Sequence, residues 1–133
     1  MVAVRADPSA VRRVVICTGK IYYDLWEEQS RRGASDVFLI RIEQLFPLRI
    51  DLINEELSCL PDDVNYFWVQ EEPENMGAWQ YVRSILAECC GSIRFIGRPA
   101  DSCPAVGSHH LHLQQQAEVV KSAFEVQISS KVD

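Results

Sequence analysis

The sequence predicts an α/β fold: a three-layer α/β/α sandwich around a mostly parallel sheet. Short, continuous apolar runs recur along the chain, as is typical of strands that are buried on both faces. Amphipathic stretches with helical spacing separate these runs. Such an alternation indicates parallel β-α-β units with right-handed crossovers and helices on both faces of the sheet. The length of 133 residues fits one domain with its own core.

The first half of the chain predicts two strands and two helices after a polar leader or linker at residues 1–12. Strands are expected at 13–18, where Gly19 ends a Val-Val-Ile-Cys run, and at 37–42. The helices are expected at 20–32, capped by Gly33, and at 51–60, stopped by Pro61. Their apolar faces comprise Ile21, Tyr22, Leu25 and Trp26 in the first helix, and Ile50, Ile53, Leu57 and Leu60 in the second.

The second half repeats the pattern. Strands are expected at 66–70 and 93–96, and helices at 77–90 and from about His110. The predicted buried faces comprise Ala78, Val82, Ile85, Leu86 and Cys89 in the third helix, and Leu113, Ala117, Val120 and Phe124 in the last. A loop from 97 to 108 and a tail from 125 to 133 leave a domain proper of residues 13–124. Four strands are expected, and either terminus could hold a fifth at the edge.

Composition excludes several classes of protein. The formal net charge of −6 argues against a general grip on nucleic acid and against an anionic membrane surface as a partner. No apolar run approaches the ~20 residues of a membrane helix, and the N-terminus lacks the apolar centre of a signal peptide. The cysteines form no Cys-x-x-Cys pair, so we expect bystander thiols in a reducing compartment and no zinc site. They are Cys17, Cys59, Cys89, Cys90 and Cys103.

Two polar segments follow predicted strands. Thr18-Gly19-Lys20 opens a helix, where backbone N–H groups and a lysine can hold an anion; a tight turn with a solvated lysine is the alternative. No nucleotide-phosphate fingerprint accompanies it. Glu71 and Glu72 are neighbours on an extended chain and point to opposite faces, so they cannot act jointly as an acid/base pair. We expect a structural or interface contact for both glutamates.

The last loop and the helix after it carry the remaining candidates. His109, His110 and His112 lack a further ligand at metal-site spacing, which leaves an anion site at the helix N-terminus or plain surface histidines. Arg98 opens a long loop, of a length that is usually functional or interfacial, and can meet a phosphate or carboxylate. No Gly-x-Ser-x-Gly elbow occurs. Spacing alone therefore indicates an α/β domain without a self-contained active site.

Four segments, in order and spacing, resemble the C-terminal end of a known enzyme family. They are Val15–Leu25, Arg41–Pro47, the run Gln-Glu-Glu-Pro-Glu-Asn-Met-Gly-Ala-Trp at 70–79, and Gly97-Arg98-Pro99 continuing to Pro104-Ala105-Val106-Gly107-Ser108-His109. The family is the thiamine-diphosphate-dependent decarboxylating component of the 2-oxoglutarate dehydrogenase complex. The likeness covers roughly residues 13–124, and the segment at 70–79 argues against the matching domain of another two-oxo-acid dehydrogenase or of a transketolase.

The resemblance implies a transketolase C-terminal-like domain and a fragment of a longer enzyme. The family holds thiamine diphosphate and magnesium in preceding domains across a dimer interface, so no catalytic, cofactor-binding or metal residue is expected here. In some members this domain also helps to bind acetyl-coenzyme A or a nucleotide such as AMP. The resemblance therefore suggests a regulatory or interface site at Arg98, Ser108, His109 and His110, and interface contacts at Glu71, Glu72 and Asn75.

One position departs from the family pattern. Members often have Gly-Ser-His-Lys-Val-His, whereas this chain has Gly107-Ser108-His109-His110-Leu111-His112. His110 replaces a permanent cation with a group that is mostly neutral near pH 7, so phosphate binding through it would be weaker or pH-dependent.

The resemblance implies a parent enzyme of the citric acid cycle that oxidatively decarboxylates 2-oxoglutarate and passes the succinyl group to the lipoyl acyltransferase component. We expect the fragment itself to be an inactive scaffold and dimer-interface domain, with an exposed apolar patch. The compartment is expected to be bacterial cytoplasm or mitochondrial matrix. A stand-alone module that binds coenzyme A or a nucleotide is the alternative.

Overall fold

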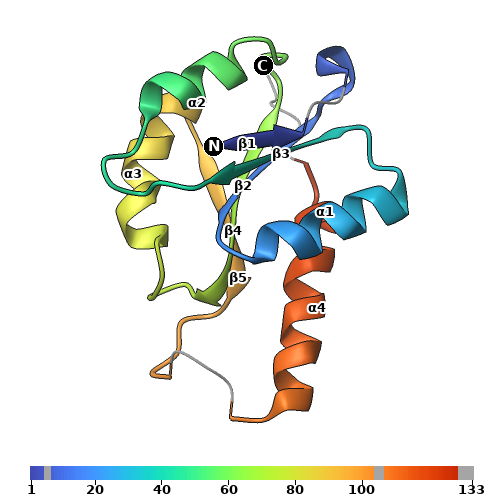
Figure 1. Ribbon diagram of the computed structural model, residues 1–133, viewed down its shortest axis with the longest axis vertical. Helices are drawn as coiled ribbons and strands as arrows, with labels where there is room; N and C mark the ends of the chain where they lie inside the picture. The colour runs from blue at the N-terminus through green and yellow to red at the C-terminus, as the bar shows by residue number, and fades with distance from the viewer. Residues whose placement is uncertain (5–6, 104–106, 129–133) are drawn as a thin grey trace.

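The computed structural model describes residues 1–4, 7–103 and 107–128, and shows one five-stranded sheet between two layers of helices (Figure 1). The strand order is β1-β3-β2-β4-β5. Strands β2 (Arg13–Thr18), β3 (Val37–Ile42), β4 (Asn65–Pro73) and β5 (Ile93–Arg98) are parallel. The short strand β1 (Val2–Val4) runs antiparallel to β3 at one edge. The predicted three-layer fold with a mostly parallel sheet is confirmed.

The two helical layers follow from the alternation of side chains along the strands. Helices α2 (Ile50–Leu57) and α3 (Trp79–Cys90) cover the face to which Val14, Ile16 and Trp68 point. Helices α1 (Ile21–Arg32) and α4 (His109–Glu125) cover the face of Val15, Cys17 and Phe67. Every one of these six strand side chains is fully buried, which explains why the strands read as continuous apolar runs.

The described residues of the predicted leader, 1–4 and 7–12, include two short elements. β1 supplies the fifth edge strand, and a 3-10 turn, η1 (Pro8–Ala10), leads into β2. The last predicted segment, 125–133, continues from the end of α4 as far as Ile128, and its final residues lie outside the described ranges, as do 104–106 of the predicted 97–108 loop. The division into leader, domain and tail stays a prediction.

Several predicted element boundaries were wrong. Helix α3 begins at Trp79 and not at residue 77, and β5 continues to Arg98 and not only to residue 96. The largest differences are in α2 and β4. Helix α2 ends at Leu57, three residues short of the predicted end, and Ser58 caps it. Strand β4 does not stop at the acidic pair but continues to Pro73, with a shift of its register against β5 between Val69 and Pro73. The physical reason is that this irregular stretch still pairs with β5, so its polar side chains do not end the strand.

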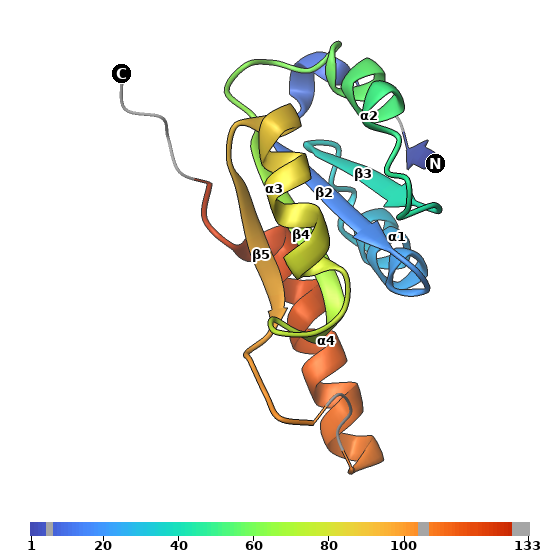
Figure 2. The ribbon, with the colours of Figure 1, turned by 90° about the vertical axis from the view of Figure 1, so that its left-hand side faces the viewer.

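Two predicted helix faces were also partly wrong. Trp26 lies at the margin of the buried stripe of α1 and is 50% exposed. In α4, Leu113 and Ala117 are exposed, and the inward-facing line instead runs from His112 and Gln116 to the buried residues of the helix's second half. The first half of α4 extends past the end of the sheet in both views (Figures 1 and 2). Because no sheet covers it there, apolar side chains are not selected for the inward position.

Candidate functional site

The carboxyl end of the sheet has a topological switch point between β2 and β4. From β2 the chain crosses through α1 to β3 on one side, and from there through α2 to β4 on the other side of β2. Crevices at such switch points are the usual ligand sites of open α/β sheets. Lys20, just after β2, lies 3.6 Å from the Glu71 carboxylate near the end of β4. The predicted Thr18-Gly19-Lys20 turn and the Glu71 carboxylate therefore meet at the switch point.

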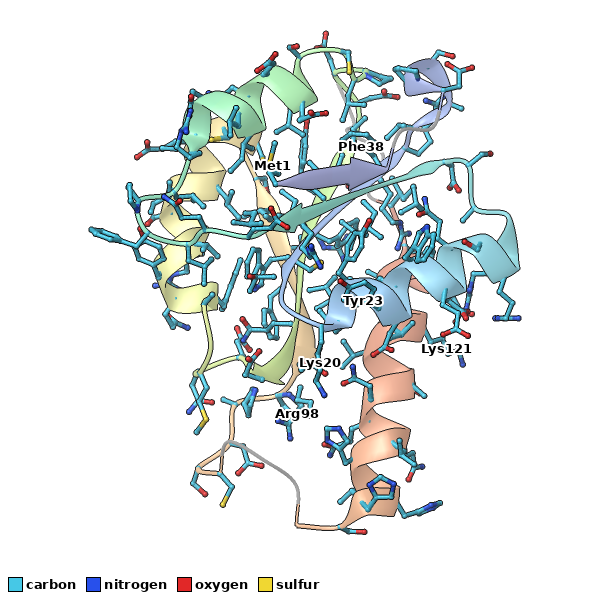
Figure 3. All side chains as sticks on the ribbon, in the orientation of Figure 1. Met1, Lys20, Tyr23, Phe38, Arg98 and Lys121 are labelled. Atoms are coloured by element: carbon cyan, nitrogen blue, oxygen red, sulfur yellow. The ribbon has the colours of Figure 1, made fainter. Side chains whose placement is uncertain are left out.

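Gln116 of α4 completes this cluster. Its side-chain Nε2 donates to Oε1 of Glu71 and to Oδ2 of Asp24 on α1, at 2.9 Å each. One amide group thus holds two carboxylates from different elements, and Lys20 offsets part of their charge. Figure 3 shows Lys20 and Arg98 at the same end of the sheet, beside α4.

A cavity of about 700 Å³ opens beside this cluster, between α1 and α4. Its lining residues are Lys20, Asp24, Glu28, Arg31, Arg32, Glu71, His112, Leu113, Gln116, Ala117, Val120, Lys121 and Glu125. The charged groups are largely paired with one another: Glu28 with Arg31 and Arg32, and Glu125 with Arg32 and Lys121. Hydrogen bonds from the two arginines hold the pKa of Glu28 at about 2. The cavity wall is therefore a network of compensated charges with no net preference for an anion or a cation.

Arg98 lies at the end of β5 and faces the same cluster from the other side. Its Nε donates to the backbone oxygen of Glu71 at 2.8 Å, and Nη1 lies 3.4 Å from Oε1 of Gln115. A second cavity of about 130 Å³ adjoins it, lined by Gly97, Arg98, Pro99, Gln115, Glu118, Val119 and Ser122. Arg98 therefore contacts α4 within the helix, at Gln115.

The other residues of the predicted regulatory site lie apart from the Arg98 cavity. Ser108 is the N-cap of α4, and its hydroxyl accepts the backbone N–H of Leu111 at 3.4 Å. His109 and His110 begin the helix, are exposed, and line neither described cavity. His112, which was not among the chosen site residues, lines the larger one. A binding role for Arg98, Ser108, His109 and His110 stays a prediction.

The three predicted interface residues have different surroundings. Glu71 is 21% exposed at its side chain and turns into the switch-point cluster, while Glu72 is exposed. Asn75 is bonded to the loop after β5: its Nδ2 donates to the oxygen of Asp101 at 2.8 Å, and its Oδ1 accepts the N–H of Asp101 at 3.0 Å. Asn75 thus has a structural role in the chain itself, and the interface contacts stay predictions.

Sequence reasoning missed Gln70, the best-buried polar side chain near the site at 1% exposed. It ends the apolar run Tyr66–Val69, and its carboxamide lies inside the turn that follows. A glutamine that continues a fully buried strand was the available signal, because buried polar groups are almost always hydrogen-bonded.

The cysteines are distributed through the domain and form no reactive centre among the described groups. Burial raises the pKa of Cys17 and of Cys90 to about 12, so both thiols stay protonated near neutral pH and are poor nucleophiles. Cys59 and Cys103 are exposed. In ranges 1–4, 7–103 and 107–128, no three His, Cys, Asp or Glu side chains are grouped as metal ligands would be. No helix within these ranges is long and apolar enough to cross a membrane.

Comparison with known proteins confirms the predicted family. The family model described as 2-oxoglutarate dehydrogenase C-terminal matches residues 2–124. Proteins named 2-oxoglutarate dehydrogenase E1 component from Brucella anthropi, Brucella ovis and Brucella melitensis biotype 2 are each 43% identical over 121 residues, covering 86% of this chain. The chain spans 12% of the length of these curated relatives. It therefore belongs to the 2-oxoglutarate dehydrogenase C-terminal family.

Proposed function

We propose that this chain is the C-terminal part of a 2-oxoglutarate dehydrogenase E1 component. The observation that carries the proposal is the 43% identity to proteins of that name, over 121 residues. The longer enzyme would oxidatively decarboxylate 2-oxoglutarate in the citric acid cycle and pass the succinyl group to the lipoyl acyltransferase component. Because the chain spans 12% of its relatives' length, this reaction belongs to the longer protein.

The residues of this chain do not fit the cofactors of that reaction. The sequence has no Gly-Asp-Gly diphosphate motif, and the described side chains form no cluster of three or more metal ligands. We therefore assign thiamine diphosphate and magnesium to preceding domains of the parent enzyme. The role left to this chain is that of a scaffold and an interface with those domains and with the dimer mate.

The surface of the chain supports the scaffold role. Several large apolar side chains are exposed: Tyr23, Trp26, Phe46, Tyr81, Leu111, Leu113 and Ile128. Phe46 is 81% exposed and faces Tyr81, with ring centroids 6.4 Å apart. Scattered exposed apolar residues are normal, but aromatic pairs and an uncovered helix end are typical of surfaces that meet another domain. Glu72, in the last part of β4, adds an exposed carboxylate to the surface at the carboxyl end of the sheet.

A regulatory ligand site is the second candidate, and the cavity at Arg98 favours it. That cavity, at about 130 Å³, is smaller than the roughly 300–1,000 Å³ of sites that enclose a drug-sized ligand. It can receive a phosphate or carboxylate group but not a whole nucleotide. A site for AMP or acetyl-coenzyme A would therefore need walls from another domain, and this chain alone should bind either ligand weakly.

Two experiments test the proposed function. The coding DNA upstream of Met1 in the native gene should continue in frame and encode a Gly-Asp-Gly motif; a stop codon and ribosome-binding site there would favour the stand-alone binding module. The purified chain should not turn over 2-oxoglutarate when thiamine diphosphate and magnesium are supplied. Robust turnover by the pure chain would contradict the scaffold role.

Calorimetry with AMP and acetyl-coenzyme A tests the second candidate. Saturable binding that is weakened at least ~10-fold by Arg98→Ala would support it, because a charged hydrogen bond contributes about 1.5–3 kcal/mol. Arg83→Ala, an exposed arginine on α3, is the matched control and should leave the affinity unchanged. If no heat of binding is measured up to millimolar ligand, the regulatory site is contradicted and the scaffold role is the one that remains.

The parent's location is proposed from the same relatives, and its partners are proposed from the family resemblance. Those reported above are bacterial, which favours the bacterial cytoplasm over the mitochondrial matrix. The proposed partners are the preceding domains, the dimer mate and the acyltransferase component.

A further inference from the structure

The side chain of Gln70 is a hydrogen-bonding centre for the turn that follows β4. Its Oε1 accepts the indole N–H of Trp68 at 2.9 Å and the backbone N–H of Trp79 at 3.1 Å. Its Nε2 donates to backbone oxygens of Glu72, Pro73 and Met76, at 3.2, 3.0 and 2.8 Å. An amide nitrogen has two hydrogens, so at least one is shared between two of these acceptors. This one carboxamide therefore satisfies polar groups from both ends of the turn.

The outer side of the same turn makes the contacts of the Arg98 region. The backbone oxygen of Glu71 accepts Nε of Arg98 at 2.8 Å, and the N–H of Glu74 donates to the oxygen of Arg98 at 3.0 Å. Asn75 bonds both backbone groups of Asp101. The turn thus lies between Gln70 on its inner side and Arg98 on its outer side, and a shift of the turn must move the groups that orient Arg98.

The fit around the carboxamide leaves little space for an alternative arrangement. Gly77 has a φ of +66°, and a Cβ there would lie 3.1 Å from Oε1 of Gln70. A Cβ at this distance would be closer than ordinary side-chain contacts, so the main chain at Gly77 packs directly against the Gln70 carboxamide.

We propose that Gln70 is a positioning residue for Arg98. Its carboxamide fixes the main chain from Glu71 to Met76. This segment in turn holds the Arg98 guanidinium toward the small cavity beside α4, where the guanidinium would meet the phosphate of a ligand. The affinity part of this inference rests on the proposed regulatory site. The positioning part rests on the geometry of the turn and is tested separately.

Two substitutions separate the amide's hydrogen bonds from its volume. Gln70→Met keeps a similar side-chain volume, buries no charge and removes all of the hydrogen bonds. Gln70→Glu keeps the shape and the acceptor, but its carboxylate cannot donate to the three backbone oxygens. At acidic pH the protonated glutamic acid regains one donor, so the disturbance by Gln70→Glu should shrink as the pH falls, while that by Gln70→Met should not change with pH.

Gln29 offers a matched control. It is also a buried glutamine, 9% exposed, and its Nε2 donates to the backbone oxygen of Val37 at 2.7 Å. It lies on α1 and makes no described hydrogen bond to the turn. Gln29→Met should lower global stability without moving the Arg98 region.

Hydrogen exchange by NMR on the 15N-labelled chain decides the positioning role. In Gln70→Met, exchange at Arg98 Nε–H and at the Glu74 amide should be at least ~10-fold faster relative to amides of β2 and β3, as expected when local opening is eased. Gln29→Met should leave this ratio unchanged. Wild-type protection of both groups in Gln70→Met, or equal acceleration at all amides in both variants, would overturn the proposal.

Calorimetry with AMP decides the affinity part. If the wild-type chain binds AMP, Gln70→Met should weaken binding by about 10-fold, the equivalent of one lost hydrogen bond, and Gln29→Met should not. Equal affinity for wild type and Gln70→Met would overturn this part. If the wild type does not bind AMP, the proposed regulatory site fails, while the exchange experiment still decides whether Gln70 positions Arg98.

Discussion

Arg13 gives the sharpest stability prediction, because a charged side chain is buried at the end of a helix. It is 4% exposed, and its Nη1 donates to the backbone oxygen of Ala123 at 2.6 Å. Nη2 donates to the backbone oxygen of Val126, just past the C-terminus of α4. The guanidinium also lies over the ring of Phe67, 4.9 Å from its centroid. Arg13 therefore caps α4 with a cation where the helix dipole is negative.

The cost of replacing Arg13 follows from these contacts. Two hydrogen bonds to a charged group contribute about 1.5–3 kcal/mol each, and the desolvation of the cation offsets part of this gain. Burial also lowers the pKa of Arg13, an effect that nearby Asp36 opposes. We expect Arg13→Met to lower the free energy of unfolding by about 2–4 kcal/mol. For a domain of this length, that corresponds to a fall in Tm of roughly 10 °C.

Urea unfolding of the chain measures this effect, and two further variants define its cause. Arg12→Met removes an exposed neighbour whose described side-chain hydrogen bonds go to nearby backbone oxygens, so it should change stability by less than about 1 kcal/mol. Arg13→Lys keeps the charge but not the forked geometry, so its loss in free energy of unfolding should lie between those of Arg13→Met and Arg12→Met. If the free energy of unfolding of Arg13→Met is within ~0.5 kcal/mol of that of the wild type, the reasoning is refuted, since the buried contacts would then contribute no net stability.

Three other substitutions test single positions: two at glycines and one at an ion pair. Gly77→Ala should destabilise by about 2–3 kcal/mol, because the new Cβ meets Gln70 in addition to the cost of a positive φ. Gly33→Ala has a similar φ of +61° with nothing within 4 Å, so thermal unfolding should show a loss of only about 1 kcal/mol; equal losses would remove the steric argument. Glu28→Gln should cost about 1 kcal/mol near neutral pH, since solvent screens the surface ion pairs that Glu28 forms with Arg31 and Arg32. Because the folded-state pKa of Glu28 is about 2, below its usual value, this contribution is complete above about pH 5 and is lost as the pH falls toward 2. A difference between wild type and Glu28→Gln that stays constant from pH 6 to pH 2, measured by urea unfolding, would contradict it.

Much of the fold could be predicted from local sequence. β2 and β3 have their predicted boundaries, and Gly33 ends α1 with its N–H bonded to the oxygens of Gln29 and Ser30. Strands buried on both faces leave a continuous apolar run, and a left-handed C-cap favours glycine, so both signals lie in the residues themselves. The exposed face of α4 at Leu113 was not predictable in this way, because apolar spacing alone does not tell where the covering sheet ends.

In the candidate site, too, some features could be predicted from the sequence and others could not. The family was predicted from four segments of the sequence. Arg98 was expected to open the loop after the strand, whereas it is the last residue of β5. The sequence by itself determined the alternation of strands and helices, since periodicity and turn residues act over a few neighbours. Only the tertiary structure decided that Glu71 meets Gln116, that Gln70 holds the turn, and that Arg13 caps a helix 110 residues away. These partners are distant along the chain, and hydrogen bonds between such residues leave no periodic trace in the sequence.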